Sequence, residues 1–160
     1  MSMSDPVQAY RFGVIGRYIG VVGLLLGGHS AVAQDLAAGR AAWEATAIDD
    51  YEYSYQRVCE CHPDIPVDTI VTVRDGKVVA VRYARKDYLE DVVLAADRVR
   101  WFRTIDDLFT LIESAQSRAA VVRAEFGSPQ GYPTAIYIDY DADLVGDELD
   151  LKITSFTPAR

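Results

Sequence analysis

The clearest pattern along the chain is a regular alternation of residue types in the stretch YEYSYQRVCECH, residues 51–62. Side chains of a β-strand point alternately to its two faces, so one face here carries Tyr51, Tyr53, Tyr55, Arg57 and Cys59. We favour a half-buried sheet face, because aromatic side chains pack well in strands. The alternative is a surface that binds a partner or ligand, since tyrosine combines an apolar ring with a polar tip. Tyr51, Tyr53, Tyr55 and Arg57 are therefore the candidate binding residues.

Similar patterns predict a helix before this strand and further strands after it. Asp35 is placed to cap a helix that ends near Ala47 and uses Trp43 as a core anchor. Beyond the first strand, alternation predicts strands over residues 68–74, 77–83, 121–126, 134–140 and 149–156. Asp75-Gly76, between two of them, is typical of a type I′ hairpin turn.

The strongest helix signal begins at Thr104. Thr104 and Asp107 have the spacing of a capping box, with aspartate in place of the usual glutamate. The apolar stripe that follows consists of Ile105, Leu108, Phe109, Ile112, Ala115 and Ala119. Residues 84–103 have no clear period and are expected to form a long loop with some local structure, with Trp101 and Phe102 covered by the helix that follows.

The order of these elements predicts the fold class. A helix followed by three strands occurs twice, and short hairpin connections favour antiparallel pairing. We therefore expect an α+β fold with two layers, in which an antiparallel sheet of about six strands is covered on one face by two helices. Residues 34–160 are expected to form a single domain.

Residues 1–33 have the organisation of a signal peptide. Arg11 and Arg17 supply positive charge, the apolar run 18–28 is too short to span a bilayer, and Ala31-Val32-Ala33 precedes a cleavage site at Gln34. We expect an exported protein, periplasmic or secreted, without a stable membrane span after processing. The alternative is an uncleaved membrane anchor.

The charge of the chain limits the classes of partner. The formal net charge is −8, and removal of Asp5, Arg11 and Arg17 from the 24 acidic and 16 basic residues leaves −9. An acidic protein is repelled by nucleic acid and by anionic lipid. The expected partner is therefore an unknown protein or small molecule, and no nucleic acid.

The sharpest chemical feature is Cys59-Glu60-Cys61-His62, which contains both cysteines. On a regular strand the two Cα atoms lie about 6.6 Å apart, near the upper limit for a disulfide, so a bridge requires a bend, which Pro63 favours. Three possibilities stay open: a Cys59–Cys61 disulfide in an oxidising compartment, free or redox-active thiols, and a copper or zinc site formed by Cys59, Cys61 and His62. No cofactor is expected.

Several segments together carry a family resemblance. They are Trp43, YEYSYQRVCEC, VRDGKVVAV, TIDDLFTLI, GYPTAIYID and GDELDLKITSF. In this order they resemble a family of small exported bacterial proteins classed as a domain of unknown function. Many members look like lipoproteins, whereas this chain lacks a cysteine at the cleavage site. A weaker, architectural likeness is to exported inhibitors of the beta-lactamase-inhibitor type and to envelope assembly factors, whose tandem modules also combine helices with antiparallel strands.

The sequence contains no common catalytic motif, and adjacent Cys61 and His62 point to opposite faces of a strand, which is unsuitable for a nucleophile and its base. We therefore expect an exported, non-catalytic binding or envelope-associated protein. The alternative is a small redox or metal-handling protein that uses residues 59–62.

Overall fold

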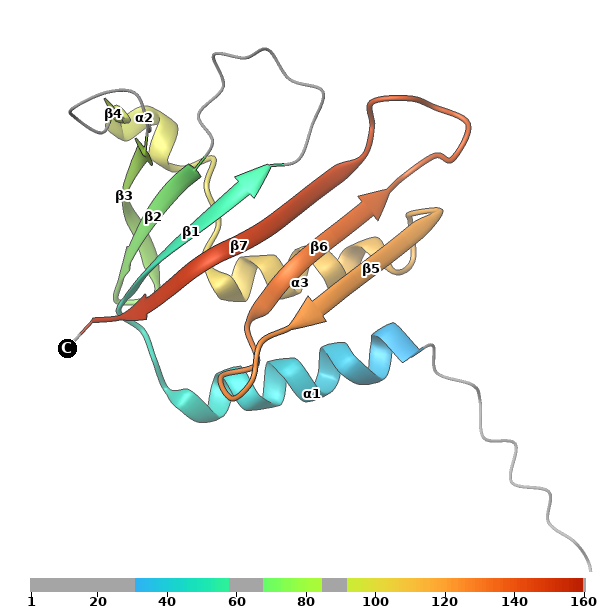
Figure 1. The fold of residues 1–160 in the computed structure, drawn as a ribbon, viewed down its shortest axis with the longest axis horizontal. Helices are drawn as coiled ribbons and strands as arrows, with labels where there is room; N and C mark the ends of the chain where they lie inside the picture. Colours follow the sequence, from blue (N-terminus) through green and yellow to red (C-terminus); the bar gives the residue numbers. More distant parts are fainter. Residues whose placement is uncertain (1–30, 58–67, 85–91, 160) are drawn as a thin grey trace, which may run out of the picture.

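The computed structural model describes residues 31–57, 68–84 and 92–159, with side chains from Asp35 onward except for those of Asp68, Ala84 and Val92. Its helices and strands are shown in Figure 1. In chain order they are α1 (Ala31–Thr46), β1 (Tyr51–Arg57), β2 (Asp68–Arg74), β3 (Lys77–Ala84), β4 (Val92–Val93), α2 (Ala96–Val99), α3 (Ile105–Ala115), β5 (Val121–Phe126), β6 (Pro133–Asp139) and β7 (Leu149–Pro158).

The described strands form one antiparallel sheet in the order β4-β3-β2-β1-β7-β6-β5. The last strand, β7, lies between β1 and β6, so the two α-β-β-β units share a continuous sheet (Figure 1). Helices α1 and α3 contact each other and pack on the sheet through β5 and β6. The predicted α+β fold with an antiparallel sheet and covering helices is confirmed; β4 adds a seventh, two-residue strand.

The turn between β2 and β3 is the predicted type I′ turn. Asp75 and Gly76 have φ values of 49° and 65°, as both central positions of this turn require. The backbone N–H of Asp75 also donates to the carboxylate of Asp50 at 2.8 Å, which ties the turn to the start of β1.

Strand β7 contains a β-bulge opposite Ser54. Tyr55 pairs with Ile153 and Tyr53 with Phe156, so β7 has one more residue than β1 in this interval. The Ser54 hydroxyl lies 2.7 Å from the hydroxyls of both Thr154 and Ser155 and holds the extra residue in place. As a result Ile153 and Phe156 pack on the same core, although strict alternation would place them on opposite faces.

Helix α1 begins at Ala31, so the expectation that Asp35 caps it is wrong. Asp35 lies inside the helix with an exposed side chain. The physical reason is that Ala31 and its neighbours favour helix, and nothing ends the helix at Asp35. Trp43 does anchor the helix in the core, where its side chain is 3% exposed. Its indole N–H donates to the Asp106 carboxylate at 3.2 Å, which links α1 to α3.

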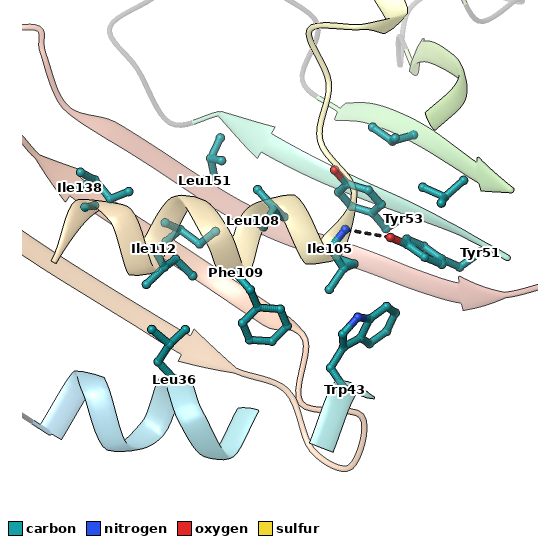
Figure 2. Close-up of a cluster of buried hydrophobic side chains, with 14 of the residues drawn as sticks. Leu36, Trp43, Tyr51, Tyr53, Ile105, Leu108, Phe109, Ile112, Ile138 and Leu151 are labelled. Atoms are coloured by element: carbon teal, nitrogen blue, oxygen red, sulfur yellow. Dashed lines mark hydrogen bonds between the residues drawn. The ribbon is translucent and has the colours of Figure 1, made fainter. Parts of the chain in front are cut away.

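Helix α3 begins as predicted. The Thr104 hydroxyl accepts a hydrogen bond from the Asp107 N–H, and the Asp107 carboxylate accepts one from the Thr104 N–H, which completes the capping box. The residues of its apolar stripe that are buried are Ile105, Leu108, Phe109, Ile112 and Ala115. Figure 2 shows this stripe facing the sheet and α1.

The segment before α3 differs from its prediction in the position of Trp101. Its local structure consists of β4 and α2, and Trp101 is 64% exposed. The expectation that α3 covers Trp101 is wrong, because the apolar stripe of α3 is buried against the sheet and α1. Phe102 instead takes the inward position and packs against the core. Within the described ranges, no helix has both the length and the apolar character needed to cross a membrane.

Candidate functional site

Tyr51 and Tyr53 of β1 hold the chain at the start of α3. The Tyr51 hydroxyl accepts a hydrogen bond from the Ile105 N–H at 2.8 Å (Figure 2). The Tyr53 hydroxyl donates to the Arg103 carbonyl oxygen. Both rings are 1% exposed and belong to the core. These two tyrosines therefore position residues 103–105 and are not accessible to a partner.

Burial determines the protonation of the three tyrosines on this face. Desolvation raises the pKa of Tyr51 and of Tyr53 well above the ordinary value. It also raises the pKa of Tyr55 to about 12, assisted by the nearby Tyr83 and opposed by Arg103, Arg57 and a hydrogen bond with Thr69. All three phenols are neutral near pH 7, as ordinary tyrosines are, and burial keeps them neutral further into alkaline solution.

Tyr55 lines a small apolar pocket between the sheet and the segment before α3. Its half-buried ring stacks on Tyr53, with centroids 6.0 Å apart. The residues lining the pocket are Tyr53, Tyr55, Trp101, Phe102, Arg103, Leu108, Ile136, Leu151 and Ile153. The cavity volume is about 30 Å³, which accommodates the end of one side chain, whereas small-molecule sites usually span about 300–1,000 Å³.

A second and wider depression lies on the other side of residues 100–103, against α3. We call it the arginine groove. Its lining residues are Arg100, Trp101, Phe102, Arg103, Asp107, Thr110, Leu111, Ser114 and Arg118, and its volume is about 630 Å³. Trp101, Phe102 and Arg103 line both the pocket and the groove, so an exposed tryptophan stands between an apolar pocket and a basic groove.

This arrangement can bind a partner through apolar contact and through the guanidinium groups. Among the described residues there is no group of three His, Cys, Asp or Glu side chains that could hold a metal ion.

The residues singled out in the sequence lie in different places. Tyr51 and Tyr53 are in the core, Tyr55 is in the pocket wall, and Arg57 is exposed at the end of β1. The Cys59-Glu60-Cys61-His62 stretch, with its disulfide and metal hypotheses, lies outside the described residues, as does most of the predicted signal peptide.

Sequence reasoning missed Trp101 and its arginine neighbours as a site. The signal was present in the run RVRWFR, residues 98–103, which places three arginines around two aromatic residues in an otherwise acidic chain. The apolar pocket wall contributed by Ile136, Leu151 and Ile153 could not be found in this way, since apolar residues on strands are ordinary core residues.

Comparison with known proteins places the chain in a family. No curated protein and no solved structure matches it. Residues 35–158 match a family of unknown function, DUF6174, and this match extends from α1 to the end of β7. The chain belongs to the DUF6174 family.

Proposed function

We propose that this protein is an exported, non-catalytic binding protein whose partner docks around Trp101. The single observation that carries the proposal is the position of Trp101, which is 64% exposed and stands beside a preformed apolar pocket. Tryptophan is among the residues that contribute most to protein–protein binding, especially beside a pocket that excludes water.

The size of the pocket favours a polypeptide partner. A cavity of about 30 Å³ accepts the end of a side chain but not a drug-sized ligand. The surroundings add to this, because the exposed Trp101 ring and the adjoining arginine groove extend the contact surface well beyond the pocket. A protein partner can insert one apolar side chain and still contact both.

The rim of this surface is held firmly by the core. Tyr53 fixes the carbonyl group of Arg103, and Tyr51 fixes the first N–H of α3, so residues 101–103 are positioned before a partner arrives. Preorganisation lowers the entropy cost of association. Export is supported by the order of charged, apolar and small residues in residues 1–33.

The proposal is tested by capture from the envelope and extracellular fractions of the source organism. Purified protein beginning at Gln34 serves as bait, and captured proteins are identified and quantified by mass spectrometry. Trp101→Ala should reduce the recovery of a specific partner by about tenfold or more, the size of a 1.4 kcal/mol loss of binding energy.

Val79→Ala is the matched control, because Val79 is 53% exposed and does not line the pocket or the arginine groove. This variant should capture the partner as the unsubstituted protein does. Equal recovery with unsubstituted protein, Trp101→Ala and Val79→Ala would contradict a docking surface at Trp101.

A further inference from the structure

We propose that the arginine groove binds an acidic segment of the partner polypeptide, with an apolar side chain of that segment against Trp101. This inference rests on the proposed function, since it concerns the same surface, and it adds the chemistry of the partner. The groove runs between residues 100–103 and α3. Its other wall is formed by Asp107, Thr110, Leu111 and Ser114 of α3 and by Arg118, which lies just beyond the end of this helix.

The positive charge of the groove is available to a ligand. Arg100, Arg103 and Arg118 are exposed, and among the described residues no carboxylate forms an ion pair with any of them. Arg118 is held on α3 by hydrogen bonds from Nε to the Ser114 carbonyl at 3.1 Å and from Nη2 to the Ser114 hydroxyl at 3.0 Å. Its guanidinium is thus positioned without the use of a carboxylate.

One carboxylate does line the groove, and it already has a partner. Asp107 Oδ2 accepts a hydrogen bond from the Thr104 N–H at 3.0 Å in the capping box. The carboxylate therefore serves the N-terminus of α3. The lining of the groove has a formal charge of +2, with three arginines and this one aspartate, in a chain whose net charge is −8.

This contrast in charge favours a short acidic segment over an extended anionic surface. A membrane rich in anionic lipid, or a nucleic acid, faces the whole acidic protein and is repelled by it. A segment of a few residues contacts the groove alone, and arginine binds carboxylates in bidentate geometry.

The apolar residues of the groove complete the expected ligand. Trp101, Phe102 and Leu111 lie among the arginines, so an apolar side chain flanked by aspartate or glutamate matches both kinds of contact. The same apolar side chain can reach the pocket, because Trp101 and Phe102 border both depressions.

The test uses three labelled hexapeptides and the protein beginning at Gln34. Each peptide has a central Leu-Phe pair, flanked on both sides by two acidic residues, by their amide counterparts, or by lysines. Binding is measured by fluorescence anisotropy. We expect the acidic peptide to bind at least about tenfold more tightly than the amide peptide and the lysine peptide to bind most weakly. Addition of salt should remove most of this difference.

Variants locate the binding site. Arg100→Gln and Arg118→Gln should each weaken binding of the acidic peptide about threefold or more, whereas Arg74→Gln should leave it unchanged. Arg74 is exposed at the end of β2 and does not line the groove, which makes it a matched control.

The outcomes separate this inference from the proposed function. If the partner is lost with Trp101→Ala but the acidic and amide peptides bind equally, the docking surface stands and the acidic ligand is overturned. The inference would also be overturned if the protein sedimented together with phosphatidylglycerol vesicles and bound the three peptides equally. So would concentration-dependent self-association that Arg118→Gln abolishes, because the occupant would then be a second copy of this chain.

Discussion

The hydroxyl oxygen of Tyr51 on β1 accepts a hydrogen bond of 2.8 Å from the backbone N–H of Ile105, the first residue of α3 (Figure 2). This N–H is one of the groups at a helix N-terminus that have no partner within the helix. A side chain of the central strand therefore satisfies it and fixes the helix relative to the sheet. The neighbouring bond from Tyr53 to the Arg103 carbonyl extends this control to the surface around Trp101.

Tyr51→Phe should lower the free energy of unfolding by about 1–3 kcal/mol, because it leaves the buried Ile105 N–H without a partner. Urea denaturation measures the change. Tyr137→Phe is the control, since no described residue forms a hydrogen bond with the Tyr137 hydroxyl and the ring stays over Arg123. The control should lie within about 0.5 kcal/mol of the unsubstituted protein. Equal losses in the two variants would show that the Tyr51–Ile105 bond contributes nothing particular.

Stability should fall in alkaline solution because of the buried phenols. Tyr55 has a pKa of about 12 in the folded protein and about 10 when unfolded. Between these two pH values Tyr55 loses its proton in the unfolded chain but keeps it in the folded protein. Its contribution to the free energy of unfolding is therefore complete below about pH 10 and is lost as the pH rises through about 12. Urea denaturation at a series of pH values should show this decline, with a smaller slope in Tyr55→Phe. A free energy of unfolding that is constant from about pH 9 to 12 is the opposing result.

Gly131→Ala should destabilise the protein strongly. Gly131 has φ of +80°, and an added Cβ would lie 2.3 Å from the Gly39 carbonyl oxygen of α1. The backbone strain costs about 1–2 kcal/mol, and the displacement of α1 adds roughly 1–3 kcal/mol. Gly146 has φ of +98°, and a Cβ added there would meet no atom within 4 Å. Gly146→Ala should therefore show the cost of backbone strain alone. Thermal or urea unfolding of the pair measures the difference. Similar losses would mean that α1 does not approach this turn closely.

Much of the fold could be predicted because local signals agree with the global arrangement. The capping box at Thr104, the Asp75-Gly76 turn and the alternation in β1 are each determined by residues close together in sequence. The bulge in β7 also has a signal, since the apolar positions change phase between Ile153 and Phe156. This change of phase can be read from the sequence alone.

Other features depend on contacts between distant segments. Nothing local places β7 beside β1, and nothing local decides that Phe102 points inward while Trp101 remains 64% exposed. Tyr53, which belongs to another element, holds the carbonyl group of the adjacent Arg103. From the sequence, Trp101 was therefore expected to be covered by the following helix, and the site around this residue was not predicted.

The charge around Trp101 can be measured without any partner. Tryptophan fluorescence comes from Trp43, which is buried, and Trp101, so ionic quenchers act mainly on Trp101. Each quenching constant is divided by the constant that the same ion gives with free N-acetyltryptophanamide. At constant ionic strength, the ratio for iodide should exceed the ratio for caesium despite the net charge of −8, because Arg100, Arg103 and Arg118 attract anions. Arg100→Gln combined with Arg118→Gln should reduce this preference. A larger ratio for caesium would contradict a positive potential at this surface.

The most direct test of the account is site-specific photo-cross-linking in the living source organism. Benzoylphenylalanine is introduced in place of Thr110, an exposed residue that lines the arginine groove together with Trp101, or in place of Val79 as an exposed control, and the full chain is expressed and irradiated. A docking surface at Trp101 predicts a discrete cross-linked product with another protein from position 110 and none from position 79. Absence of a product at position 110, or the same products from both positions, would contradict it.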